Sequence, residues 1–152
     1  MLLIAAIGKM RQGPERELVT RYRTRIRPRL EITELSEARG ALTEKRRQEG
    51  SALLHATRGN YQRVALDEGG TVFDSIGFAA AIDKILSHGK GVAFLIGGAE
   101  GLDQAALDEC ALKISFGRMT WPHMMVRCML AEQLYRARSI SSGHPYHRAT
   151  RP

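Results

Sequence analysis

Residues 141–148, with the sequence SSGHPYHR, gather side chains that can exchange protons or bind phosphate. Histidine titrates near neutral pH, and the planar guanidinium of Arg148 suits phosphate oxygens. Pro145 restricts the backbone, so this polar tail is hard to explain as packing, and we interpret it as part of a site. Two alternatives stay open. One is a disordered basic end, and the other is a zinc site at His144 and His147, for which no third ligand is obvious.

A second pair of chemical groups lies on a helix predicted over residues 123–138. Its apolar positions recur at helical spacing and predict one buried face, formed by Val126, Leu130, Leu134 and Ala137. Arg127 and Arg138 lie at the margin of that face. Glu132 and Arg136 share the opposite side, four residues apart, where a carboxylate and a guanidinium can pair across one turn. The alternative is an ordinary surface ion pair.

The sequence LIGGAEG at residues 95–101 places glycines where a predicted strand gives way to a helix. In open α/β sheets this is the carboxyl edge, where ligands bind. We expect Gly97 and Gly98 to permit positive φ angles and to let backbone N–H groups approach a ligand closely. A dinucleotide fingerprint would need glycine at Ile96, and a P-loop would need a Gly-Lys-Ser/Thr ending, so both are excluded. The alternative is a tight turn that needs small residues.

A second irregular stretch, with the sequence SFGRMTWPH, covers residues 115–123. It contains the single tryptophan of the chain, Trp121, and it contains Pro122, which cannot continue a hydrogen-bonded ladder. We therefore predict a loop here, leading into the helix that begins near His123.

The elements that must position these groups alternate between strands and helices. Apolar runs predict strands at residues 2–7, 30–35, 61–66 and 91–96, the second of them at an edge of the sheet. Helical spacing predicts helices from Pro14 until Pro28 ends the first, then at 43–57, 75–86, near 102–111 and at 123–138. Residues 67–70 are predicted as a turn. This alternation predicts the α/β class, with a mainly parallel sheet and flanking helices, in a single domain over residues 1–152.

Composition limits the function classes. The 152 residues are 43% hydrophobic and carry a formal net charge of +7, so an anionic partner is expected, with a solvated basic surface as the alternative. The first apolar run is too short for a membrane span and lacks the features of a secretory signal, so we expect a cytoplasmic protein with no membrane partner. Cys110 and Cys128 show neither disulfide nor metal-binding spacing and are expected to be reduced core thiols.

Four segments together resemble the bacterial large-subunit ribosomal RNA methyltransferase H family, within the SPOUT class of knotted methyltransferases. They are LIGGAEG at 95–101, MTWPH at 119–123, LAEQLYRA at 130–137 and HPYHR at 144–148. The resemblance covers nearly the whole chain. One departure is Gly143, where the family usually has asparagine, and it removes one side-chain hydrogen bond.

The resemblance implies a C-terminal trefoil knot, a homodimer, and S-adenosylmethionine as the cofactor, with no metal. It implies methylation at N(3) of a pseudouridine in 23S ribosomal RNA, with the assembled ribosome as the expected substrate. By matching positions, the cofactor is expected to contact Leu66, Gly97, Gly98, Gly117, Arg118, Met119, Thr120, Trp121 and Pro122. The knot rests on the resemblance alone, because no periodicity distinguishes a threaded chain from an unthreaded one.

The implied chemistry needs the protein to align the methyl donor with its acceptor and to manage one proton. We expect Tyr146 or His147 to assist deprotonation of the acceptor N–H. Arg136 and Arg148 are expected to hold phosphate or developing negative charge, with Glu132 orienting one of them. The arginine-rich first helix and a second subunit are expected to add RNA contacts. The rival functions are a non-catalytic RNA-binding or ribosome-associated module and a metal-dependent hydrolase built on the two tail histidines.

Overall fold

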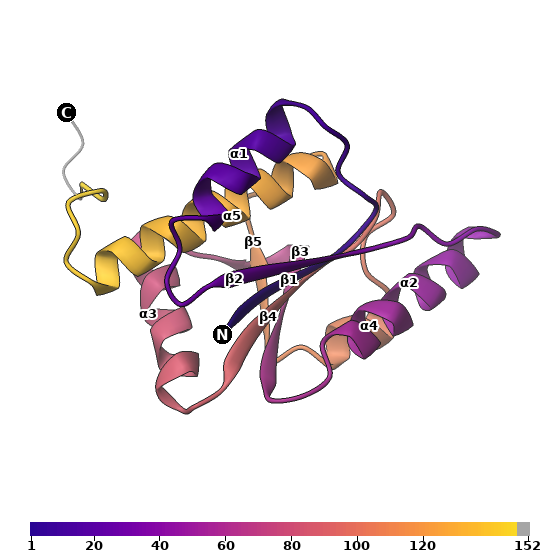
Figure 1. The fold of residues 1–152 in the computed structure, drawn as a ribbon. Helices are drawn as coiled ribbons and strands as arrows, with labels where there is room; N and C mark the ends of the chain where they lie inside the picture. Colours follow the sequence, from indigo (N-terminus) through magenta and orange to yellow (C-terminus); the bar gives the residue numbers. More distant parts are fainter. Residues whose placement is uncertain (149–152) are drawn as a thin grey trace.

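Five parallel strands form the centre of the fold in the computed structural model, which describes residues 1–148 (Figure 1). The strands lie in the order β2-β1-β4-β3-β5. Their bounds are Leu2–Ile7 for β1, Leu30–Leu35 for β2, Tyr61–Val72 for β3, Gly91–Ile96 for β4 and Leu112–Ser115 for β5. All four strand pairs are parallel, and β2 lies at an edge. The predicted α/β class and edge strand are therefore confirmed.

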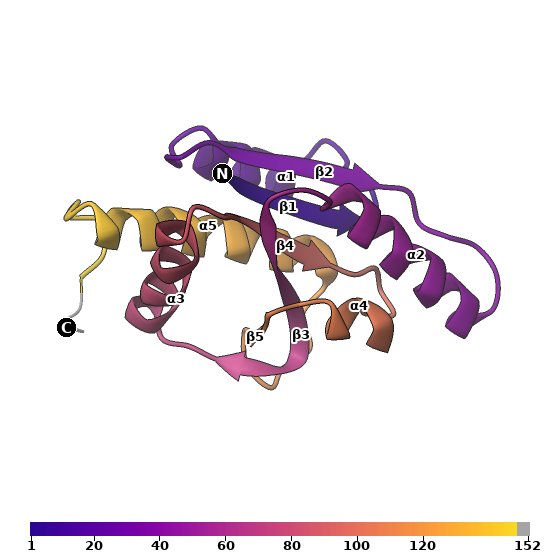
Figure 2. The same ribbon diagram turned by 90° about the horizontal axis from the view of Figure 1, so that it is seen from below.

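Both faces of the sheet are covered by helices, which explains the unbroken apolar runs of β1 and β4. On β1, Leu2 and Ile4 belong to one core cluster while Leu3 belongs to the other, because successive side chains point to opposite faces. One face carries α1 (Pro14–Arg23), α3 (Ser75–Ser87) and α5 (His123–Ser141), and the other carries α2 (Leu42–Ala56) and α4 (Gln104–Asp108). Figures 1 and 2 show α1 beside α5 and α2 beside α4.

Two of the predicted helices are shorter in the structure. The first ends at Arg23 instead of running to Pro28, because Ile26 leaves the helical path and is completely buried in the core. The helix expected near residues 102–111 is confined to α4, whose first turn is capped by Asp103 through its side chain and the Ala106 amide, 3.2 Å apart. The residues that follow α4 turn into β5, a strand the sequence did not predict.

The predicted turn at residues 67–70 is wrong, because β3 continues through it to Val72. Leu66 and Thr71 both pair with Ile114 of β5, so the intervening residues form a bulge in the strand. Gly70 lies at this bulge, and a Cβ there would sit 2.6 Å from the backbone nitrogen of Ile114. The strand therefore bends around its neighbour instead of ending.

A buried arginine fastens α5 to the sheet. Arg127 is 2% exposed, and its Nη1 donates to Glu34 Oε1 of β2 at 3.1 Å, while its Nη2 donates to the carbonyl oxygen of Ile7 at the end of β1. Burial lowers the pKa of Arg127, and the Glu34 carboxylate opposes that effect. The sequence had placed this residue at the margin of the apolar face, whereas the structure makes it a structural link between three elements.

The turn after α5 aims the tail back along the helix. Gly143 has φ 70°, its amide donates to the Ile140 carbonyl at 3.2 Å, and the His144 amide donates to the Ser139 carbonyl at 2.9 Å. This pair of hydrogen bonds is a Schellman motif, in which glycine is the commonest residue at the left-handed position and asparagine the next. Gly143 therefore suits this turn without a side-chain bond.

The cysteines and the helices were both expected to be those of a protein without disulfides or membrane spans. Cys110 and Cys128 are both buried and free, which confirms them as core thiols, and burial raises the pKa of each. Within residues 1–148, no helix has the length and hydropathy needed to cross a membrane.

Candidate active site

A cleft of about 320 Å³ opens at the bulge of β3 and at the carboxyl ends of β4 and β5. The structure brings together seven of the nine residues expected to contact the cofactor, and these line the cleft: Leu66, Gly97, Gly98, Gly117, Met119, Thr120 and Trp121. Arg118 and Pro122 lie on the loop after β5, together with Gly117 and Trp121, but they do not line the cleft. The loop that follows β5 thus folds over the same edge of the sheet as the glycine turn that follows β4.

The cleft combines an apolar floor with an acidic rim. Leu66 and the 3%-exposed Ile114 are among the apolar lining, while the Trp121 ring remains 41% exposed at the mouth. The charged lining consists of Asp67, Glu68, Glu100 and Arg46. Three carboxylates against one guanidinium favour a ligand that joins an apolar surface to positive charge.

The glycine turn owes its shape to a close backbone approach. A Cβ on Gly97 would lie 2.6 Å from the carbonyl carbon of Gly101, and the Gly101 amide donates to the Gly98 carbonyl at 3.1 Å. The expected positive φ angle is found at Gly101, with φ 75°, and not at Gly97 or Gly98. Glycine at position 97 is therefore required because the chain folds back on itself there, beside the cleft.

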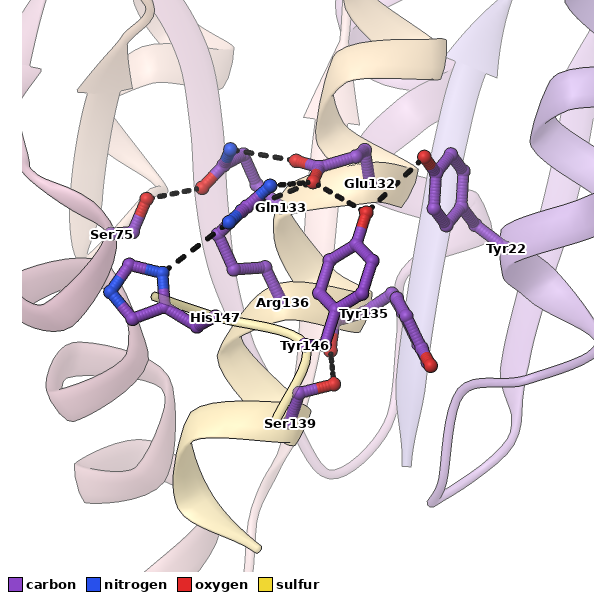
Figure 3. Close-up of polar contacts among 9 residues, drawn as sticks. All are labelled: Tyr22, Ser75, Glu132, Gln133, Tyr135, Arg136, Ser139, Tyr146 and His147. Atoms are coloured by element: carbon purple, nitrogen blue, oxygen red, sulfur yellow. Dashed lines mark hydrogen bonds and ion pairs between the residues drawn. The ribbon is translucent and has the colours of Figure 1, made fainter. Parts of the chain in front are cut away.

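A second group of predicted site residues meets on the outer side of α5, and we call Glu132, Arg136, Tyr146 and His147 the tail cluster (Figure 3). Glu132 Oε1 accepts from Arg136 Nε at 3.0 Å and from the Tyr146 hydroxyl at 3.0 Å. The Nη1 group of Arg136 lies 3.3 Å from His147 Nδ1 and, being a donor, makes that nitrogen the acceptor. The Glu132–Arg136 pair is therefore the anchor of the tail and not an isolated surface pair.

A tyrosine of α1 completes this arrangement. The Tyr22 hydroxyl lies 3.4 Å from that of Tyr146, and because Tyr146 donates to Glu132, Tyr22 must be the donor between the two. The Tyr146 ring meets Tyr135 edge-on, with centroids 4.6 Å apart, and the Arg136 guanidinium lies 4.9 Å from its centroid. The aromatic contacts and the hydroxyl bonds together hold the tail against α5 and α1.

The electrostatics of the tail cluster favour donors over bases. Burial first, and then the hydrogen bonds with Tyr22 and Glu132, raises the pKa of Tyr146, so its phenol stays protonated at neutral pH. The hydrogen bond to Glu132 raises the pKa of Arg136 and keeps its charge. In this arrangement Tyr146 is a donor and Arg136 a fixed cation.

The other two polar residues of the tail are arranged differently. Arg148 is exposed and makes no ion pair with residues 1–148. His144 Nδ1 accepts from the Tyr146 amide at 3.2 Å. Among the described residues, no group of three or more histidine, cysteine, aspartate or glutamate side chains could hold a metal ion.

The cleft and the tail cluster lie apart in one copy of the chain. Val126 of α5 lines the cleft, and Glu132 and Arg136 follow it by about 9 Å and about 15 Å along the helix, at 1.5 Å per residue. Between them lies a mainly apolar groove of about 580 Å³, which shares Ile114 and Phe116 with the cleft. The two halves of the expected site are neighbours along α5, but they do not meet.

Comparison with known proteins decides the family. A family model described as a predicted SPOUT methyltransferase matches residues 1–147. The chain belongs to the SPOUT methyltransferase family. It is 52% identical to the ribosomal RNA large subunit methyltransferase H of Gluconacetobacter diazotrophicus, over 98% of each chain. It is 44% identical to the protein of the same name from Acidiphilium cryptum, over 99% of this chain and 96% of the relative.

Among solved structures, this SPOUT methyltransferase resembles the SpoU methyltransferase of Streptomyces viridochromogenes, crystallised with the cofactor AdoMet. The TM-score is 0.44 at 13% identity, over 90% of this chain and 57% of the other. The family model and the relatives from Gluconacetobacter diazotrophicus and Acidiphilium cryptum confirm the resemblance stated from the four sequence segments.

Several residues of the cleft and of the tail cluster in this SPOUT methyltransferase were not identified from the sequence. Asp67 and Glu68 directly follow Leu66 within β3. The sequence predicted that this strand ends at residue 66, so the carboxyl-edge rule could have pointed to both carboxylates. Arg46 and Tyr22 come from helices far away in sequence, and no local pattern signals their approach.

Proposed function

We propose that the protein transfers the methyl group of S-adenosylmethionine to N(3) of a pseudouridine in 23S ribosomal RNA. The observation that carries the proposal is the cleft at the carboxyl edge, with its glycine turn and acidic rim, in a chain of this family. The substrate follows from relatives that are named for ribosomal RNA of the large subunit and match this chain from end to end. The natural place for such an enzyme is the cytoplasm, where ribosomes are found.

The cleft suits S-adenosylmethionine in its chemistry. Leu66 and Ile114 on the apolar floor and Trp121 at the mouth offer surfaces for the adenine, and the main chain of the glycine turn lines the same cleft. The acidic rim complements the positive charges of the sulfonium and ammonium groups. When bound, the cofactor supplies a methyl group that is already reactive, so the protein's task is alignment. Arg118 and Pro122 would act by shaping the loop from Gly117.

The tail cluster would handle the nucleotide. Because the phenol of Tyr146 stays protonated, we assign it as a hydrogen-bond donor and assign proton uptake to His147. His147 Nδ1 is engaged by Arg136 in this arrangement, so it becomes free to accept a proton once that guanidinium turns to a phosphate oxygen. Glu132 orients Arg136, and the exposed Arg148 offers a second guanidinium to the RNA.

The separation of cleft and tail cluster leads us to propose a homodimer. The groove between them exposes Met125 and Val72, which are 41% and 64% accessible, and a second copy would cover this apolar surface. If two α5 helices pair antiparallel about a two-fold axis, the cleft end of one lies beside the tail end of the other. The resemblance further implies that the loops lining the cleft form a trefoil knot.

Two inactive variants test the shared site. His147→Ala should lose proton uptake at the tail cluster, and Gly97→Ala should lose cofactor binding in the cleft. When the two variant proteins exchange subunits, the mixed dimers should regain methyl transfer if each site uses both subunits. Met125→Glu should shift the sedimentation of the wild-type dimer toward the monomer. A wild-type protein that sediments as a fully active monomer would refute the homodimer.

The proposed reaction is tested on ribosomes from a strain that lacks the enzyme. Assembled ribosomes and free 23S ribosomal RNA are incubated with the protein and labelled S-adenosylmethionine, and the product is mapped by mass spectrometry. Methyl incorporation at N(3) of a pseudouridine supports the proposal, and its absence from both substrates refutes it. His147→Ala and Arg148→Ala should abolish transfer while retaining cofactor binding. Calorimetry addresses the non-catalytic alternative, because a plain RNA-binding module gives no saturable heat with the cofactor.

A further inference from the structure

Arg46 is the single arginine among the described residues that line the cleft, and its charge is not neutralised there. Its Nη2 donates to the carbonyl oxygen of Leu102 at 2.5 Å, which holds the side chain beside the glycine turn. Its Nε is buried without a hydrogen-bond partner, and no carboxylate within residues 1–148 forms an ion pair with it. A guanidinium has five N–H donors, so most of this group's capacity is unused.

The position of Arg46 contrasts with the rest of the lining. Asp67 and Glu68 lie at the bulge of β3 and Glu100 lies on the glycine turn, so the other charged side chains of the lining are all carboxylates. A half-buried guanidinium whose N–H donors lack acceptors destabilises the protein, and an anion that accepts those hydrogen bonds removes this cost. The cleft therefore carries one cationic group among acidic ones, a pattern that complements a zwitterion with one carboxylate.

We propose that Arg46 binds the carboxylate of the cofactor's methionine moiety and thereby selects donors that carry an amino-acid group. This inference rests on the proposed function, since it assumes that the cleft takes S-adenosylmethionine. A guanidinium and a carboxylate match in a planar fork, and Leu102 fixes one edge of the fork in advance. The acidic rim then faces the ammonium and sulfonium groups.

The test compares ligands with and without the amino-acid group. Isothermal titration measures the affinity of S-adenosylmethionine, S-adenosylhomocysteine and 5′-methylthioadenosine, the last of which lacks both the carboxylate and the ammonium. Arg46→Ala should weaken the first two about 10- to 100-fold and leave the third within about twofold. The matched control is Arg47→Ala, because Arg47 is the next residue of α2 and pairs with Glu44 on the surface, 2.7 Å away. It should change none of the three affinities.

The outcomes separate this inference from the proposed function. If the wild-type protein binds none of the three ligands, the proposed function fails and takes the inference with it. If the wild type binds S-adenosylmethionine and Arg46→Ala binds it equally well, the inference alone fails. An equal loss for 5′-methylthioadenosine also overturns it, because Arg46 would then only shape the cleft. Should Arg46→Ala not fold, as judged by circular dichroism, Arg46→Gln provides the same comparison while keeping a donor for Leu102.

Discussion

Replacing Tyr146 by phenylalanine removes one hydroxyl and keeps the ring that contacts Tyr135 and Arg136. The lost bonds are the donation to Glu132 at 3.0 Å and the contact with Tyr22 at 3.4 Å. A hydrogen bond to a charged acceptor contributes about 1.5–3 kcal/mol when buried, and the longer contact contributes little. Because the tail is partly exposed, we expect the lower end of this range, about 1.5 kcal/mol. This corresponds to roughly a tenfold shift in the equilibrium between the tail held against α5 and the tail released from it, toward the released form.

The expected result is a kcat/KM for methyl transfer that falls by up to about tenfold, the full factor applying where the released tail becomes the main state. The affinity for S-adenosylmethionine should be unchanged, since the lost hydroxyl lies outside the cleft. Initial rates on ribosomes and calorimetry with the cofactor measure the two quantities. Tyr135→Phe is the matched control, because the Tyr135 hydroxyl forms no hydrogen bond with residues 1–148. Wild-type rates for Tyr146→Phe would refute a role of this bond, and additive effects of Tyr146→Phe and Glu132→Gln would show that the two groups act independently.

Three further outcomes follow from the structure. Gly97→Ala places a Cβ 2.6 Å from backbone carbon, so the turn must shift, and cofactor affinity by calorimetry should fall about tenfold or more. Burial raises the pKa of Cys110 to about 11, so at pH 8 only about 0.1% is thiolate, and its reaction with a disulfide reagent should be slow in the folded protein and accelerate as pH rises toward that value. Arg21→Ala with Arg25→Ala should weaken ribosome binding and reduce the slope of log affinity against log salt by about one per arginine, because these exposed side chains can contact RNA phosphates.

Each of these outcomes has its own contrary result. Wild-type cofactor affinity in Gly97→Ala would mean that the turn adapts without affecting the cleft. Labelling of Cys110 in native protein as fast as in urea-unfolded protein would contradict its buried position. For the arginines, the comparison is Arg58→Ala, an exposed residue in the loop between α2 and β3, and an equal change in salt slope there would show only a general charge effect.

The sequence by itself determined the elements whose signal is local. The apolar run of β1 is buried on both faces, and a strand of that kind needs no alternation to be recognised. The periodicity of α5 and the four-residue spacing of Glu132 and Arg136 predicted both the helix and the ion pair, because those contacts form within one turn. The tail was found by composition, and the family by its motifs.

Only the tertiary structure decided how distant segments meet. Tyr22 and Tyr146 are 124 residues apart, and the Arg127 bond to Ile7 spans 120 residues. Such contacts depend on how helices pack across the sheet, which periodicity does not encode. The same holds for β5, a strand of four residues that is recognisable only through its pairing with the bulged β3. It holds most clearly for Arg46, whose place beside the glycine turn follows from the docking of α2 against α4 and from nothing in its own sequence neighbourhood.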